Sequence, residues 1–420
     1  MSAVSIVGAY NTKFGSFVTH SHETNLLTDH LSIYDLILEA GQGALADAGV
    51  SGQEVGGLWL GSFAPGQLAN QEHLAAFAAE IDPEGLRFKS LTRCEAACAS
   101  GSVAIYDALY AVESGRVDIA LVVGVEKMHL IDTKGVTHIL STCSYWPEEG
   151  ALGMTFPGLF AQYAKAYQER YKIPNSSLER MLATVSALAY TNGVDNPLAH
   201  FGRGSPPDKQ GLFSADAILN LAPSANPVIA APLRLHDCSL ITDGAAAVVI
   251  MKTSAALKTG KRAVEIAGIG HVNERLAISV RPNMYEMTAG KEAVRRAFQE
   301  AKISIANVDM AEVHDCFTIT QLLCTEALGL SKDGQSGDDY VAGRFTRTDS
   351  QCPINLSGGL KAKGHPVGAT GVSMHALIYK QLVDEPIGAT PSKQPPSVGV
   401  TFNVGGSAVT NCVSVLRRLS

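Results

Sequence analysis

The stretch "ILEAGQGALADAGVSGQEVGGLWLGSF", residues 37–63, decides the fold, because its order of features recurs in "AVRRAFQEAKISIANVDMAEVHDCF", residues 293–317. Both run from helical periodicity through a polar linker and a valine to a short apolar strand and a loop. A second pair, residues 98–112 and 368–383, opens a helix from small residues each time. Chance similarity between helices rich in Ala and Gly is the alternative. We favour a duplicated α/β unit, in which the strand-end loops of both halves meet over one site.

The segments around these repeats continue the α/β pattern. Apolar runs typical of buried strands stand at residues 4–10, 118–128, 242–251, 263–272 and 397–416, and helical periodicity stands at 32–50, 288–304 and 368–385. Residues 131–231 are rich in Gly and Pro around one helical passage, Phe160 to Asn192, and this predicts a large insertion that covers an active site. We therefore expect an N-terminal half at 1–130 and 232–260, an inserted loop domain at 131–231 and a C-terminal half at 261–420.

The composition is that of a globular chain with large cores. The 420 residues are 46% hydrophobic and 17% charged. A net charge of -7 with both signs interspersed argues against nucleic acid and anionic membranes as partners. No cationic leader precedes a long apolar run, and about 18 uncharged apolar residues never stand together, so we expect no membrane span and a cytoplasmic protein. The eight irregularly spaced cysteines are expected to be free thiols.

Two of these cysteines, Cys94 and Cys98, precede a helix in "CEAACASG". A metal site needs about four convergent ligands, which this pair does not offer, so we expect no metal. A redox pair needs two intervening residues, and here there are three. Burial as small hydrophobic side chains is the remaining alternative. Position separates the two sulfurs: Cys98 lies at the helix start, where unpaired N–H groups and the dipole favour a thiolate, whereas Cys94 is expected to pack.

A nucleophile needs a base and an oxyanion site, and other loops offer both. His365 stands in "NLSGGLKAKGHPVGATG", where glycines and a proline hold an irregular backbone that lets its ring face a pocket. In "NVGGSA", residues 403–408, two glycines are placed to aim a backbone N–H at an oxyanion. His200 and Arg203, in "AHFGRG", either border the substrate pocket or lie in a solvated loop.

The loop "HDCF" brings an imidazole, His314, and a thiol, Cys316, to one strand end. The alternative is that His314 and Asp315 only pin the loop. A second His-Asp-Cys triplet, at residues 236–238, shows that such a run also occurs without an assigned role.

These loops together resemble the thiolase superfamily. The motifs "CASG", "CSLITDGAAAVV" and "GGLKAKGHPVGATG" are similar to thiolase motifs, and "HDCF" with the closing "NVGG" resembles the sterol-carrier-protein type of thiolase. The match runs in order through nearly the whole chain. The resemblance implies an α/β thiolase fold, with duplicated βαβαβαββ halves in a five-layered α-β-α-β-α arrangement and an inserted loop domain.

The resemblance also implies roles for individual residues. Cys98 matches the nucleophile that takes an acyl group from an acyl-CoA or a β-ketoacyl-CoA, and His365 matches the base that activates it. His314 stands where most thiolases have an asparagine that positions a water in an oxyanion hole. Ser239 matches a serine that contacts the pantetheine arm.

The closing motif departs from most thiolases. Their acid/base cysteine stands in a CxG motif, where this chain has Asn403-Val404-Gly405. In the sterol-carrier type the HDCF cysteine takes over, so Cys316 is expected to move the α-proton. The closing loop, with Asn403 and Gly405, is expected to form an oxyanion hole with the backbone N–H of Cys98.

Three functions are compatible with these expectations. The leading one is a CoA-dependent thiolase, an acyl-CoA C-acyltransferase that condenses or cleaves β-ketoacyl-CoA, with coenzyme A and acyl-CoA as substrates and no tightly bound cofactor. The second is a related acyltransferase with a non-CoA or unusual acceptor, working with a small zinc-ribbon/OB-fold partner. The third is a non-catalytic scaffold or lipid-binding protein. Subunits of this family are usually dimers, so we expect a homodimer.

Overall fold

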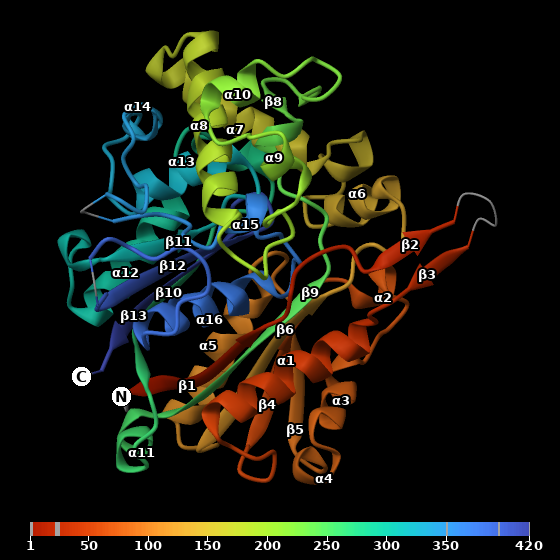
Figure 1. Cartoon of the computed structure of the whole chain (residues 1–420), viewed down its shortest axis with the longest axis vertical. Coiled ribbons are helices and arrows are strands. Elements are labelled where there is room, and N and C mark those ends of the chain that lie inside the picture. Colours follow the sequence, from red (N-terminus) through yellow and green to blue (C-terminus); the bar gives the residue numbers. More distant parts are fainter. Residues whose placement is uncertain (1–2, 22–25, 350–351, 394, 420) are drawn as a thin grey trace.

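The computed structural model describes residues 3–21, 26–349, 352–393 and 395–419. Within this part of the chain, nine strands form one mixed sheet in the order β11-β12-β13-β10-β1-β9-β6-β4-β5 (Figure 1). They are β1 (Val4–Asn11), β4 (Gly57–Gly61), β5 (Ser90–Cys94), β6 (Ile119–Glu126), β9 (Gly244–Lys252), β10 (Val264–Asn273), β11 (Met310–Val313), β12 (Val398–Gly405) and β13 (Thr410–Arg418). Two separate hairpins join β2 (Val18–His20) to β3 (Leu27–Asp29) and β7 (Val228–Ala230) to β8 (Leu233–Arg234).

Helices cover this sheet and fill the space between its halves. The longer ones are α1 (Ile33–Ala48), α5 (Ser100–Glu113), α6 (Thr133–Ser141), α7 (Phe156–Tyr171), α8 (Asn175–Gly193), α12 (Thr288–Ala301), α13 (Thr318–Ala327) and α16 (Thr370–Leu382). The shorter ones are α2 (Pro65–Leu68), α3 (Leu74–Phe77), α4 (Pro83–Leu86), α9 (Pro206–Lys209), α10 (Ala215–Leu219), α11 (Thr253–Lys258), α14 (Ser336–Val341) and α15 (Gly359–Ala362). Among the described residues, the helices are too short or too polar to cross a membrane.

The two halves of the sheet repeat one pairing pattern. In the first half, β9 pairs antiparallel with both β1 and β6. β4 pairs parallel with both β6 and β5. In the other half β10 pairs antiparallel with β13 and β13 with β12, which runs parallel to β11. A single parallel bridge, Ala311 to Ile354, stands where the first half has β5. The duplication predicted from the sequence repeats is therefore confirmed.

The side-chain alternation of the strands builds five layers. Leu58 and Val123 point to the face that α1 covers, whereas Val122 and Val248 point to the face that carries α5 and α16. α5 and α16 contact each other between the two halves, and α12 covers the outer face of β10 and β13 (Figure 1). The layers are α1, the half of the sheet with β1, β9, β6, β4 and β5, then α5 with α16, then the half with β10, β13, β12 and β11, and finally α12. This order confirms the predicted α-β-α-β-α arrangement.

One local prediction needs correction, and one strand was not predicted. The helical passage expected at Phe160 to Asn192 is two helices, because Lys172 adopts the left-handed conformation (φ 56°) and Pro174 has no N–H with which to continue α7. β5 has no apolar run in the sequence: it is the edge strand, and Ser90, Thr92 and Arg93 are exposed. Its place beside β4 nevertheless matters, because the loop after β5 carries Cys98.

Candidate active site

A tight turn between β5 and α5 presents Cys98. Ala97 has a positive φ of 51°, an uncommon conformation for a residue with a side chain. The turn is held by Ser100, whose Oγ donates to the Ala97 carbonyl (2.6 Å) and accepts the Ala96 N–H (2.9 Å). The first turn of α5 follows directly, with Ala99 as its N-cap residue. The backbone therefore holds the Cys98 sulfur in one place.

His365 is held as a neutral imidazole with a defined tautomer. The Thr370 hydroxyl donates its single proton to the Pro366 carbonyl (3.0 Å), so it accepts from His365 Nδ1 at 2.7 Å. Nδ1 therefore carries the ring proton, and Nε2 has a free lone pair. Burial, with a smaller effect from Lys363, lowers the pKa of His365 to about 3. Gly364 before it has φ 116°, where only glycine is unstrained.

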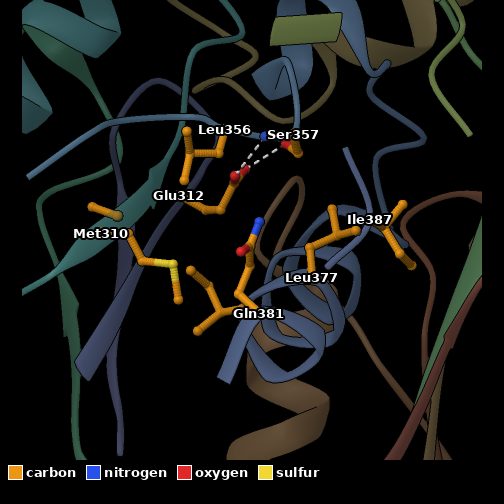
Figure 2. Close-up of a pocket in the computed structure, with 9 residues that line it drawn as sticks. Met310, Glu312, Leu356, Ser357, Leu377, Gln381 and Ile387 are labelled. Carbon is orange, nitrogen blue, oxygen red and sulfur yellow. Dashed lines mark hydrogen bonds between the residues drawn. The ribbon is translucent and has the colours of Figure 1, made fainter. Parts of the chain in front are cut away.

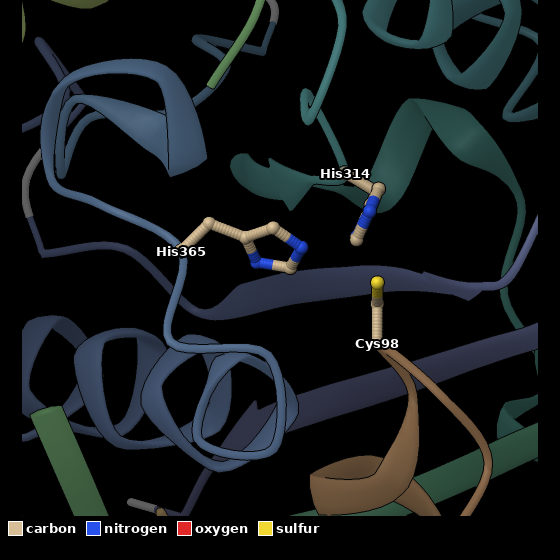
Figure 3. A group of neighbouring side chains, drawn as sticks. All are labelled: Cys98, His314 and His365. Atoms are coloured by element: carbon tan, nitrogen blue, oxygen red, sulfur yellow. The ribbon is translucent and has the colours of Figure 1, made fainter. Parts of the chain in front are cut away.

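Cys98, His314 and His365 form the centre of the site. The Cys98 Sγ and one nitrogen of each ring all lie within 4.8 Å of one another, and all three residues are buried. The two rings are perpendicular, with centroids 5.2 Å apart, and Figure 3 shows both turned toward the sulfur. Burial, and then His365, holds the pKa of His314 well below its usual value. The sulfur therefore faces two neutral imidazoles.

The two explanations of the "HDCF" loop apply to different residues. Asp315 pins the loop, because its carboxylate accepts the N–H groups of Leu360 (2.6 Å) and Lys361 (3.2 Å) from the loop that leads to His365. His314 lies on the other side of the backbone, at the sulfur of Cys98. Asp315 therefore joins the two loops, and its neighbour His314 faces the Cys98 sulfur.

This trio of sulfur and nitrogen atoms has the composition of a metal-binding group. The same arrangement places a base and a hydrogen-bond donor beside a nucleophile. The expectation of no metal stays a prediction.

A largely apolar cavity of about 260 Å³ is lined by two members of the trio, Cys98 and His365. It brings together Cys98, His365, Cys316 and Ser239, four of the residues singled out from the sequence. Its other walls come from the chain between β6 and β9, namely Met128, Thr133, Thr137, Leu140, Cys143, Phe156, Pro157, Ile229, Leu235, Cys238, Leu240 and Ile241, from Phe317 in the "HDCF" loop, and from Val367 in the loop after His365. The cavity has the predominantly apolar lining, with a few polar groups, of a ligand site.

Cys316 and Ser239 are neighbours in this cavity. The Ser239 N–H donates to the Cys316 carbonyl (2.8 Å). Cys316 Sγ lies 3.9 Å from the Thr320 hydroxyl, and burial raises its pKa well above the usual value. The second His-Asp-Cys triplet lies beside the first, but its His236 turns to the Tyr190 hydroxyl, 2.7 Å away. The two triplets therefore differ in the position of the histidine, because His314 lies at the Cys98 sulfur and His236 at the Tyr190 hydroxyl.

Four other cavities do not include Cys98 in their walls. One, of about 470 Å³, is lined by Lys13, His200 and Arg203 with residues 194–205, so His200 and Arg203 border a different cavity from the one at the trio. Figure 2 shows another, between β11 and α16, where Glu312 accepts from the N–H and the hydroxyl of Ser357. Its volume of about 10 Å³ holds at most one water. The apolar cavity is therefore the candidate active site.

Comparison with known proteins identifies the family. The model of the thiolase N-terminal domain matches residues 4–254, and that of the thiolase C-terminal domain-like family matches residues 270–418. The chain belongs to the thiolase family. It is 35% identical to acetyl-CoA acetyltransferase of Methanothermobacter thermautotrophicus over all of both chains. It is 28% identical to rat (Rattus norvegicus) sterol carrier protein 2, over 89% of this chain and 66% of that protein.

A solved structure titled "Ltp2-ChsH2(DUF35) aldolase" has the same fold, with a TM-score of 0.79 at 18% identity over 99% of this chain and 98% of that one. The predicted resemblance to thiolases of the sterol-carrier type is thus confirmed, and the chain is a CoA-dependent thiolase, an acyltransferase.

The closing loop of this thiolase places a backbone N–H at the Cys98 sulfur. That N–H belongs to Gly406 and lies beside the N–H of Cys98 itself, and the oxyanion role expected of Gly405 stays a prediction. Asn403 is not a free oxyanion donor, because its amide nitrogen already lies 3.0 Å from the Cys98 carbonyl oxygen and 3.2 Å from His314 Nδ1. β12 ends at Gly405, so the turn that follows it aims the next residue at the sulfur.

Cys98 of this thiolase rests as a thiol. Burial raises the pKa of Cys98 to about 12, although the N–H groups of Gly406 and of Cys98 itself lower it. The expected thiolate at the helix start is corrected, because desolvation outweighs two hydrogen bonds. Glu126, which sequence reasoning missed, also raises this pKa. Its only sequence signal is a carboxylate at the end of an otherwise apolar strand.

Glu126 joins two loops near Cys98 to the end of β6. Its carboxylate accepts the Ser62 hydroxyl (3.1 Å) and the N–H groups of Phe63 (2.8 Å) and Gly368 (3.0 Å). Burial raises the pKa of Glu126 to about 7. The loop after β4 and the loop after His365 are thereby tied to the end of β6.

We expect the alkylation rate of Cys98 by iodoacetamide to rise about tenfold per pH unit between pH 7 and pH 9. The reason is that the thiolate fraction increases with pH until the raised pKa is reached. Peptide mass spectrometry after timed labelling measures the rate. A rate that levels off below pH 8 would contradict the neutral resting state and indicate a preformed thiolate–imidazolium pair.

Proposed function

We propose that this thiolase transfers acyl groups through a thioester on Cys98, with His365 as the base for the thiol and Cys316 as the group that moves the α-proton. The observation that carries the proposal is the trio of Cys98, His314 and His365, of which Cys98 and His365 line an apolar cavity. A neutral thiol beside a neutral imidazole with a free Nε2 lone pair is ready for proton transfer during attack.

The acylation step follows from these positions. The Cys98 proton passes to His365 Nε2 while Sγ attacks the carbonyl carbon of an acyl-CoA. The carbonyl oxygen becomes an oxyanion next to the sulfur, where the N–H groups of Cys98 and Gly406 already point. The C–S bond to coenzyme A then breaks, and the imidazolium returns the proton to the leaving thiolate. Sulfur suits this step because a thiolate is both a good nucleophile and a good leaving group.

The carbon–carbon step uses Cys316. In the cleavage direction the Cys98 thiol gives its proton to His365 Nε2 while Sγ attacks the β-carbonyl carbon of a β-ketoacyl-CoA, the bond between the α- and β-carbons breaks, and Cys316 protonates the departing enolate. The thiol of coenzyme A then attacks the acyl-enzyme and gives its proton to the Cys316 thiolate, and the released Cys98 thiolate takes its proton back from the His365 imidazolium. Burial keeps Cys316 in the thiol form that this donation needs. In this proposal the His314 ring donates a hydrogen bond to the enolate oxygen, and condensation is the same path reversed.

Acetyl-CoA is the substrate that we propose to test first, because the relative from Methanothermobacter thermautotrophicus is named acetyl-CoA acetyltransferase. Incubation of the chain with acetyl-CoA should add one acetyl group to the intact mass, on the Cys98 peptide. Acetoacetyl-CoA with coenzyme A should give two acetyl-CoA. If no acyl-CoA, short or long, gives an adduct, the proposal is overturned.

A homodimer, and a second subunit of the zinc-ribbon/OB-fold type, also belong to the proposal. The second subunit is supported by the likeness in fold to the structure titled "Ltp2-ChsH2(DUF35) aldolase". The same acetoacetyl-CoA assay, run on the purified chain alone, tests whether a partner is required. Full turnover without a second protein would contradict that requirement.

A further inference from the structure

The side-chain amide of Asn403 lies between three groups that are distant in sequence. Its nitrogen is 3.0 Å from the Cys98 carbonyl oxygen and 3.2 Å from His314 Nδ1, and its oxygen accepts the Ser102 hydroxyl at 2.8 Å. All four residues are buried. Gly371 makes this approach possible, since a Cβ there would lie 2.7 Å from Asn403 Oδ1.

These contacts fix the orientation of the amide. A backbone carbonyl oxygen only accepts hydrogen bonds, so the atom that faces the Cys98 carbonyl is the NH₂ group of Asn403. Its second N–H then faces His314 Nδ1, which must be an unprotonated acceptor. A neutral imidazole has one ring proton, and for His314 that proton is therefore on Nε2.

We infer that Asn403 is a positioning residue that holds His314 in the Nε2–H tautomer, so that the ring donates a hydrogen bond to the substrate oxygen. The inference deepens the proposed function and rests on it for the role of His314. In the other tautomer Nε2 would present a lone pair, which repels a thioester or enolate oxygen. Ser102 supports the arrangement through Asn403 Oδ1.

The test compares Asn403→Asp with Asn411→Ala in the full chain labelled with ¹⁵N-histidine. Asn411 is the matched control, because it is buried on the neighbouring strand and its amide binds only the carbonyls of the 408–409 turn. The His314 signal is identified by its loss in His314→Gln. We expect protonated Nε2 in the wild type and in Asn411→Ala, and protonated Nδ1 in Asn403→Asp, whose carboxylate accepts that proton.

Kinetics give the second readout. In Asn403→Asp, kcat should fall about 10²-fold, the usual effect of losing one oxyanion donor, while the KM for acyl-CoA stays within about twofold. A wild-type His314 with its proton on Nδ1, or an Nε2–H tautomer unchanged in Asn403→Asp, would overturn the inference. If Asn403→Asp does not fold, the wild-type spectrum decides. An absent acyl adduct on wild-type Cys98 would refute the proposed function and leave the tautomer result standing.

Discussion

Cys98→Ala is expected to form no acyl-enzyme and to lose turnover by about 10⁴-fold or more, because removal of a catalytic nucleophile has effects of this order. Cys98 is 7% exposed and the substitution removes only its sulfur atom, so the fold should persist. Intact-mass measurement after incubation with acetyl-CoA detects the adduct, and the thiolysis of acetoacetyl-CoA measures turnover.

Cys94→Ala is the matched control for this variant. Cys94 lies four residues earlier, is also buried, and its sulfur donates to Asp107 at 3.4 Å instead of facing the cavity. It should acylate at the wild-type rate. An adduct that persists in Cys98→Ala, or that disappears in Cys94→Ala, would show that Cys98 is not the acylated cysteine.

Cys316→Ala should separate the two half-reactions. Acylation of Cys98 should proceed within about twofold of wild type, whereas condensation should slow by about 10² to 10⁴-fold, the range that general acid–base groups contribute. The reason is that Cys316 lines the cavity but stands outside the Cys98, His314 and His365 trio. Exchange of the α-protons of acetyl-CoA with deuterated water measures the lost step directly.

Cys352→Ala is the control for loss of a buried thiol, because Cys352 is fully buried in a hydrophobic core cluster and its sulfur lies 3.9 Å from the Pro353 carbonyl, away from the cavity. It should leave both half-reactions unchanged. Normal exchange and condensation in Cys316→Ala would refute the proposed role of that thiol and would direct attention to another base in the cavity.

Much of the site could be predicted from the sequence because its residues stand in loops with distinctive local chemistry. Glycines and a proline around His365, and small residues after Cys98, are visible without a structure. Thr370 stands in the same quoted loop, five residues after His365, but only the 2.7 Å contact shows that it sets the tautomer. For Glu126 the sequence shows only one acidic residue near the end of an apolar strand, and this does not indicate which loops it joins.

The sequence by itself determined the duplicated order of strands and helices, the choice of Cys98 over Cys94, and the loops that meet at the site. These are properties of periodicity and of local backbone chemistry, which short stretches carry. Only the tertiary structure decided that Gly406 faces the sulfur, that Cys98 rests as a thiol, and that Asn403 bonds to His314. Those features depend on desolvation and on distances between residues up to about three hundred positions apart, and they arise only when the two halves pack together.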